Sequence, residues 1–213
     1  MLSPSRVLAA ALLSLSTLAA NAAIVTFGSR ASFDATFAGS VRETWDGFAA
    51  GTVIPDGTTT NGITYLSSSG DARVVGGFLV TTSPNSLGNT TNGFFGPSDT
   101  ITFTFDAPVL AFGIDINTFA DAAGAYSATT DLADVVGSVF NPFPGATTGQ
   151  FIGFSSDAAF SSVTIAGLPS NFGYTLDTLR AVDAPGTVPE PGSLALAAFA
   201  LLSLGAAARA RSK

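Results

Sequence analysis

The segment Thr100–Ile116, which reads TITFTFDAPVLAFGIDI, alternates apolar and polar residues over most of its length. In its first half the apolar residues alternate with threonine, which gives a strand one apolar face and one hydroxylated face. The second half continues the alternation, with four apolar residues expected on one face: Leu110, Phe112, Ile114 and Ile116. The intervening Asp106-Ala107-Pro108 is typical of a turn, so the segment predicts a β-hairpin.

Short segments of the same kind recur along residues 23–184, separated by Gly and Pro. We expect further strands at 24–27, 41–45, 63–66, 73–75, 78–81, 135–140, 150–155, 161–165 and 174–182, with a hairpin turn at Gly76-Gly77. The stretch Ser32–Phe37 predicts one short helix capped by Ser32. About ten short strands with little helix indicate an all-β protein, and we predict a two-sheet antiparallel β-sandwich that is jelly-roll-like.

The composition excludes several classes of chemistry. The 213-residue chain has no Cys and no His, and its only Lys is Lys213. Disulfides, thiolate nucleophiles, a Ser-His-Asp triad, a P-loop and a Schiff-base lysine inside the domain are therefore excluded. Residues 23–184 carry 14 acids and only four Arg. We expect no nucleic-acid binding, because that requires neutralisation of phosphates, and any metal site would use oxygen ligands, which favours calcium.

The two ends of the chain differ from the middle, which holds 17 of the 18 Phe. Residues 1–22 predict a cleavable signal peptide, because Arg6 precedes an apolar run and Ala20-Asn21-Ala22 fits a small-residue cleavage pattern. Residues 185–213 contain Pro189-Glu190-Pro191, an apolar helix of marginal length for a membrane span at 193–208, and a basic end. The sequence thus predicts a signal peptide at 1–22, a β-sandwich domain at 23–184 and a tail at 185–213.

This tail resembles the PEP-CTERM sorting signal of Gram-negative bacteria, in the motif Pro189, Glu190 and Pro191, the hydrophobic helix and the closing Arg209 and Arg211. The resemblance implies export by Sec-type machinery and processing by an exosortase, a membrane protease-transpeptidase that acts near the motif. It further implies transient residence in the inner membrane through 193–208, and then a place at the cell surface or in an exopolysaccharide or biofilm matrix. A plain C-terminal membrane anchor is the alternative.

Parts of the middle domain are similar to domains of exported proteins that bear such a tail. These parts are ITFTFDAPVLAFGID at 101–115, FIGFSSD at 151–157, FSSVTI at 160–165 and YTLDTL at 174–179. The similarity implies a jelly-roll sandwich of the lectin or carbohydrate-binding-module type. It implies a fold more than an activity, since sandwiches host many unrelated functions.

Four residues are candidates for binding. Calcium often ties the first strands of such modules to the last, so the resemblance makes Glu43, Asp46 and Asp177 candidate calcium ligands, with solvated acids as the alternative. Tyr126 falls in an expected loop at 120–129, where an exposed ring would suit a glycan contact. The single Trp, Trp45, is expected in the core instead, because alternation places it on one face with Val41.

Glycoside hydrolysis requires two carboxylates, and Asp115 and Asp157 are conceivable partners. Nothing in their spacing singles them out among 14 acids, so we predict that the protein is not an enzyme. The sequence favours an exported, surface- or matrix-associated β-sandwich protein that acts by structure or adhesion within extracellular polysaccharide. A carbohydrate-binding module with structural calcium is the alternative, and a glycoside-active enzyme is a third hypothesis.

Overall fold

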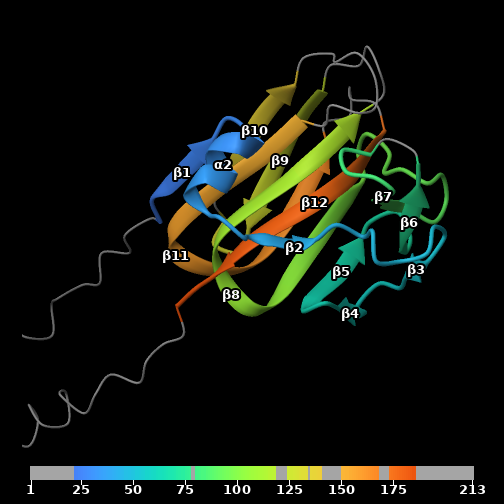
Figure 1. Ribbon diagram of the computed structural model, residues 1–213, viewed down its shortest axis with the longest axis horizontal. Coiled ribbons are helices and arrows are strands. Elements are labelled where there is room, and N and C mark those ends of the chain that lie inside the picture. Colours follow the sequence, from blue (N-terminus) through green and yellow to red (C-terminus); the bar gives the residue numbers. More distant parts are fainter. Residues whose placement is uncertain are drawn as a thin grey trace, which may run out of the picture.

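The computed structural model of the protein describes residues 22–77, 80–118, 124–133, 135–140, 150–167 and 173–185. Within these ranges the chain forms twelve strands and one short helix (Figure 1). In chain order the elements are β1 (Ile24–Phe27), α2 (Arg30–Thr36), β2 (Val41–Glu43), β3 (Val53–Ile54), β4 (Thr59–Thr60), β5 (Ile63–Ser67), β6 (Ala72–Gly76), β7 (Asn85–Asn89), β8 (Thr100–Thr118), β9 (Gly124–Thr130), β10 (Val135–Phe140), β11 (Gln150–Gly167) and β12 (Tyr174–Asp183).

Two long strands, β8 and β11, pair antiparallel with each other along both of their halves. Their register is irregular between Ser155 and Ser162, and Phe160 in this stretch faces Val109 of β8. Both strands curve strongly at this level, toward the lower edge of the view in Figure 1. Each long strand therefore contributes one half to each of two layers.

The first sheet begins with β1, the N-terminal half of β11, the C-terminal half of β8 and then β12, each paired with the next. Strand β12 also pairs with two further strands, β2 and β7. Strand β7 pairs in turn with β6, and β6 with β3. The second sheet contains β10, β9, the other halves of β11 and β8, and then β5 and β4. All of these ladders are antiparallel. The fold is thus an all-β antiparallel sandwich, as predicted, in which two strands pass from one layer to the other through bends.

The core lies between the two sheets and consists mainly of aromatic and branched side chains. Its largest fully buried members include Trp45, Tyr65, Phe103, Phe112, Phe154, Phe160 and Tyr174. The buried position of Trp45 confirms the prediction that it belongs to the core. Its expected face partner Val41 is 51% exposed, however, because the strand ends at Glu43 and the backbone turns at Trp45, which has a φ of 59°.

The predicted hairpin at Asp106-Ala107-Pro108 is wrong, because these residues lie within β8 at its bend. The segments on either side both pair with β11, so they cannot pair with each other. The bend also shifts the alternation: Val109 is buried in the core, whereas Leu110, expected there, is only partly buried. A turn-forming sequence and a sheet corner have the same local composition, and only the partner strand distinguishes them.

Two smaller expectations also need correction. Strand β6 forms its hairpin with β7, where Gly76 faces Asn85, rather than with a strand at 78–81, of which 78–79 lie outside the described residues. The helix begins at Arg30, and its N-cap is Ser29, whose side chain accepts a hydrogen bond from the Ser32 amide at 3.2 Å. A serine three residues earlier provides the same capping chemistry as the predicted one.

Helix α2 packs on the outer face of the first sheet, beside β1 (Figure 1). Phe33 and Phe37 lie one turn apart, with ring centroids 5.0 Å from each other, and Phe33 is fully buried against Phe151 of β11. Gly113 and Gly153 face each other in the sheet below. A Cβ at Gly153 would clash with the Phe151 ring and lie 3.0 Å from the Phe33 ring, so the glycine leaves room for the two rings that pack between helix and sheet.

The predicted signal peptide and sorting tail, including the helix at 193–208, lie outside the described residues. Within the described ranges, no helix has the length and apolar character required to cross a membrane.

Candidate functional site

A pocket of about 440 Å³ lies where the chain leaves α2 and runs along the end of β12. The helix ends at Thr36, and the amide of its C-cap residue Phe37 donates to the Phe33 carbonyl at 2.8 Å; Gly39 follows with a φ of 76°. This left-handed conformation favours glycine and redirects the chain toward β2. The Ala181 amide then donates to the Ser40 carbonyl at 2.9 Å, which fixes the segment against β12. The lining residues are Thr36, Phe37, Ala38, Gly39, Ser40, Val41, Arg42, Ala181, Val182 and Asp183.

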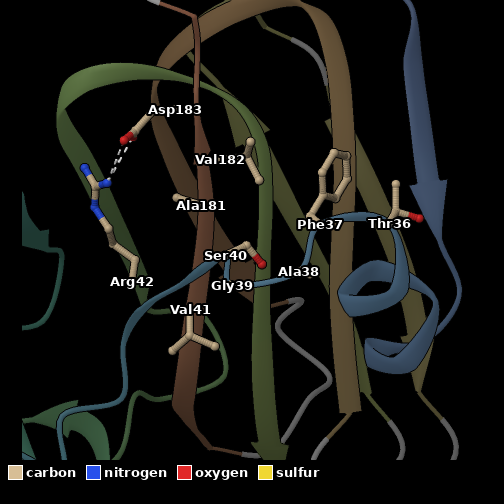
Figure 2. Close-up of a pocket in the computed structure, with 10 residues that line it drawn as sticks. All are labelled: Thr36, Phe37, Ala38, Gly39, Ser40, Val41, Arg42, Ala181, Val182 and Asp183. Atoms are coloured by element: carbon tan, nitrogen blue, oxygen red, sulfur yellow. Dashed lines mark hydrogen bonds and ion pairs between the residues drawn. The ribbon is translucent and has the colours of Figure 1, made fainter.

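The pocket presents an aromatic ring on one side and a polar ion pair on the other (Figure 2). The ring is that of Phe37, which is partly buried and packs edge-on against Phe27 at 5.6 Å. The ion pair joins Arg42 Nη1 to both Asp183 oxygens, at 3.0 and 3.1 Å. Between the two sides lie Val182 and Ser40, and the Ser40 Oγ is buried without a hydrogen-bond partner within the described part of the chain.

The charge of the pocket is slightly negative, because Arg42 faces two carboxylates. Its Nη2 lies 3.1 Å from Asp106 Oδ1 while Nη1 contacts Asp183. Both carboxylates are more than half exposed, so their remaining oxygen lone pairs are accessible to a ligand. An anion would meet net repulsion here, whereas an uncharged ligand with several hydroxyls would find acceptors, donors and an aromatic surface together.

A second polar cluster lies beneath α2, on the outer face of the first sheet. Asp115 of β8 is fully buried and accepts a hydrogen bond from Arg30 Nε at 2.8 Å. Its other oxygen lies 3.6 Å from Arg180 Nη1 and accepts no hydrogen bond. Arg180, which is 4% exposed, also pairs with Asp34 of α2 at 2.6 Å. These four residues form what we call the buried ionic network, and it ties the helix to β8 and β12.

Burial is the main influence on the pKa values of the carboxyl groups in and next to this network, and it raises them. Loss of water around Asp115 raises its pKa to about 6, and the two guanidinium groups only partly oppose the effect. Asp177 of β12 lies beside Asp115 of β8 and is also fully buried, and burial raises its pKa too. Hydrogen bonds from Thr81, Thr82 and Thr178 work in the opposite direction for Asp177. Two buried carboxyl groups on neighbouring strands are therefore easier to protonate than ordinary aspartates.

The prediction that Tyr126 makes an exposed glycan contact is wrong. Tyr126 belongs to β9, its side chain is 2% exposed, and its ring packs edge-to-face on Tyr174 at 5.2 Å. Burial raises the pKa of its hydroxyl. The Ala- and Gly-rich surroundings suggested a loop, but pairing of β9 with β11 turns this side chain into the core.

The three candidate calcium ligands are not gathered into one site. Glu43 accepts from the backbone amides of Thr44 and Trp45, at 2.9 and 2.7 Å, and Asp46 accepts from the Asn85 amide at 2.9 Å. Asp177 accepts from the amides of Thr81 and Thr82, both at 2.7 Å. In the ranges that the structure describes, no group of three or more acids could hold a metal ion. These carboxylates stabilise turns through amide hydrogen bonds, and the arrangement does not fit calcium.

The conceivable catalytic pair Asp115 and Asp157 does not share an open site. Asp115 is sealed under α2, whereas Asp157 is exposed and its Oδ1 accepts a hydrogen bond from the Ala23 amide at 2.7 Å. The sorting motif Pro189-Glu190-Pro191 lies outside the described residues.

Sequence reasoning missed the residues of both clusters, although one signal was available. The domain has only four Arg, and three of them, Arg30, Arg42 and Arg180, form the ion pairs described above. In a strongly acidic domain a rare base is the natural partner of a buried or clustered acid. No local pattern indicates which acids these are, because the partners lie up to 146 residues apart.

Comparisons with known proteins give only weak likenesses. No family model matches the chain, and no curated protein resembles it significantly. Among solved structures, a mutant of the family 29 carbohydrate-binding module CBM29-2 aligns with a TM-score of 0.35 and 11% identity, over 62% of this chain and 90% of the module. The CBM22-1 xylan-binding domain from Paenibacillus barcinonensis gives 0.35 and 15%, over 65% and 99%. The catalytic domain of an alpha-1,3-glucanase gives 0.33 and 13%, over 68% and 31%. These TM-scores are too low to establish a shared family or ligand.

Proposed function

We propose that the protein is an exported, non-enzymatic β-sandwich protein that associates with polysaccharide at the cell surface or in an extracellular matrix. Its pocket beside α2 binds a neutral sugar unit. The observation that carries the proposal is the combination of the Phe37 ring with the Arg42–Asp183 pair across one open pocket. Sugars have apolar C–H faces that stack on aromatic rings and hydroxyl pairs that bond to carboxylate and guanidinium groups.

The electrostatics of the pocket support a neutral ligand over a charged one. Arg42 is already neutralised by Asp106 and Asp183, so it offers hydrogen bonds without a net positive field. The acidic domain as a whole repels uronic acids and phosphates. The pocket is open to solvent, which suits a unit within a longer chain. A binding role needs no catalytic pair, and the sealed position of Asp115 removes the best candidate acid from any bound glycan.

A first test removes one sugar-binding group without changing its shape. We expect Asp183→Asn to weaken binding of neutral oligosaccharides by about tenfold, because a hydrogen bond to a charged group contributes about 1.5–3 kcal/mol. Phe37→Leu, which keeps an apolar side chain but removes the ring, should weaken the same ligands. A glycan array followed by titration calorimetry measures both effects.

Asp157→Asn is the matched control, since Asp157 is an exposed acid on β11 and an Asn there can still accept from Ala23. Its affinity should equal that of the wild type. The absence of binding to every neutral oligosaccharide would refute the proposal, as would unchanged affinity in both pocket variants. Binding that EDTA abolishes would restore the calcium-dependent alternative, and turnover of a bound glycan would restore the enzymatic one.

The cellular part of the proposal rests on the sequence of the two ends. Sec-type machinery would export the chain and remove residues 1–22, and an exosortase would process the tail near Pro189-Glu190-Pro191. We expect the mature protein, isolated from a host that has an exosortase, to begin at Ala23 and to lack residues 193–208. Intact mass spectrometry measures both ends, and a C-terminus that still ends in Lys213 would argue for a plain membrane anchor.

A further inference from the structure

The outer face of the second sheet is covered with hydroxyl groups arranged in rows across the strands. One row runs over β4, β5, β8 and β11: Thr59, Thr64, Thr104 and Ser162. A second row runs over β5, β8, β11 and β9: Leu66, Thr102, Thr164 and Thr129. A third row follows over β8, β11 and β9: Thr100, Ala166 and Ser127. We call these eleven residues the hydroxyl face, and all of them are exposed or partly exposed.

The opposite side of the same strands fills the core, which explains the alternation. Ile101, Phe103 and Phe105 point inward from β8, and Val163 and Ile165 do so from β11. Solvation of the outer face requires only polar residues of any kind. The eleven residues are instead almost all threonine or serine and none of them carries a charge. The exposed acid Asp131 lies at the edge of the face, where it accepts hydrogen bonds from the Ser161 and Ser162 amides.

The hydroxyls are also held in place. Thr59 and Thr64 bond through their hydroxyls at 2.6 Å, and Thr102 and Thr164 do so at 2.8 Å. Threonine is β-branched, so its χ1 angle is restricted on a strand and little entropy is lost when a ligand binds. Neighbouring strands lie about 4.8 Å apart, so the rows form a regular array of hydroxyl and methyl groups.

We propose that the hydroxyl face is a docking surface for a long neutral polysaccharide, which lies along the rows and bonds through its own hydroxyls. The inference rests on the proposed function and adds a second, extended contact to the sugar-binding pocket. The eleven residues include no base and are bordered by the acid Asp131, which favours a neutral polymer, since an anionic one would be repelled by the acidic domain. The methyl groups and Leu66, which is 57% exposed, provide apolar contact for the C–H faces of the sugars.

The test uses insoluble neutral glucans, amorphous cellulose and curdlan, in binding isotherms with the purified protein. Thr102→Val/Thr164→Val removes two hydroxyls at the centre of the face while it keeps shape and strand propensity. We expect this variant to bind both glucans about tenfold or more weakly, because each lost hydrogen bond contributes a few-fold to tenfold in affinity. Its affinity for short oligosaccharides in the pocket should not change. Circular dichroism and the denaturation midpoint confirm that it folds.

Thr26→Val/Thr91→Val, which removes two exposed hydroxyls elsewhere, is the matched control and should bind like the wild type. Asp183→Asn separates the two proposals, because it weakens oligosaccharide binding through the pocket alone. If Asp183→Asn reduces binding and Thr102→Val/Thr164→Val does not, the hydroxyl face is only a solvated surface and the inference is overturned, while the proposed function stands. Loss of glucan binding in the threonine variant alone supports the face and refutes the pocket. Failure of the wild type to bind either glucan, or a preference for anionic alginate, overturns the inference.

Discussion

Arg180→Met will lower the free energy of unfolding by about 3–5 kcal/mol, the usual loss when one partner of a buried ion pair is removed. Arg180 is 4% exposed and donates to Asp34 at 2.6 Å and to the Thr178 carbonyl at 2.8 Å. Its guanidinium also lies 3.6 Å from Asp115 and covers the Phe151 ring at 5.7 Å. Methionine fills a similar volume, so the loss reports mainly on the broken ion pairs: Asp34 loses its partner, and the buried Asp115 keeps only Arg30.

The expected loss is measured by urea denaturation at pH 7, with two comparison variants. Arg42→Met removes an ion pair whose carboxylates are more than half exposed, so it should cost less than about 1 kcal/mol. Arg180→Met combined with Asp115→Asn removes the buried carboxylate that Arg30 alone would then have to compensate, and it should recover part of the stability. A loss below 1 kcal/mol for Arg180→Met, or no recovery in the double variant, would show that the buried ionic network is not a unit.

The buried ionic network also supports the sugar-binding pocket. Asp34 and Phe37 both belong to the α2 segment, three residues apart, and one bonds Arg180 while the other lines the pocket. With seven residues, α2 is too short to be stable alone, so its position depends on these contacts and on Phe33. The local sequence therefore determines where the helix forms, whereas contacts with distant strands determine where it packs and so where Phe37 lies in the pocket.

Much of the sandwich follows from local sequence, because alternation along a strand is a local pattern. Ile101, Phe103 and Phe105 point to the core as their spacing predicts, and the hydroxylated side of the same strand is the outer face. The local pattern did not predict which strands pair with each other. Asp106-Ala107-Pro108 has the composition of a turn, yet its neighbours pair with residues of β11 more than 35 positions away. No pattern within the segment carries that information.

The candidate sites were harder to predict than the fold, for the same reason. The pocket joins residues 36–42 to 181–183, and neither stretch has a motif. Glu43 is an example: it was a candidate calcium ligand, with a solvated acid as the alternative, but it is 6% exposed and accepts hydrogen bonds from the amides of the turn that follows. Tyr126 was expected in an exposed loop, but its segment forms a paired strand and the side chain is buried.

The second large effect is a dependence of stability on pH that originates at Asp115. Burial raises the pKa of this carboxyl from 3.8 to about 6, so the folded protein holds the proton more tightly than the unfolded chain does. For such a group, the stabilising contribution is fully present below pH 4 and is lost as the pH rises through 6. A salt-bridged aspartate with a lowered pKa, which is the ordinary case, instead makes the fold more stable as the pH rises. Burial explains the difference, because the loss of water around Asp115 disfavours the charged form more than Arg30 and Arg180 stabilise it.

We therefore expect the stability of the wild type relative to Asp115→Asn to fall by about 2–3 kcal/mol between pH 4 and pH 7, since each unit of pKa difference corresponds to about 1.4 kcal/mol. The comparison removes contributions from the other acids, which both proteins share. Urea denaturation at a series of pH values measures the difference, and an NMR titration of the Asp115 carboxyl should give a pKa near 6 in the folded state. A relative stability that rises with pH would mean that Arg30 and Arg180 outweigh burial, because an ionised Asp115 would then be the form that the fold prefers.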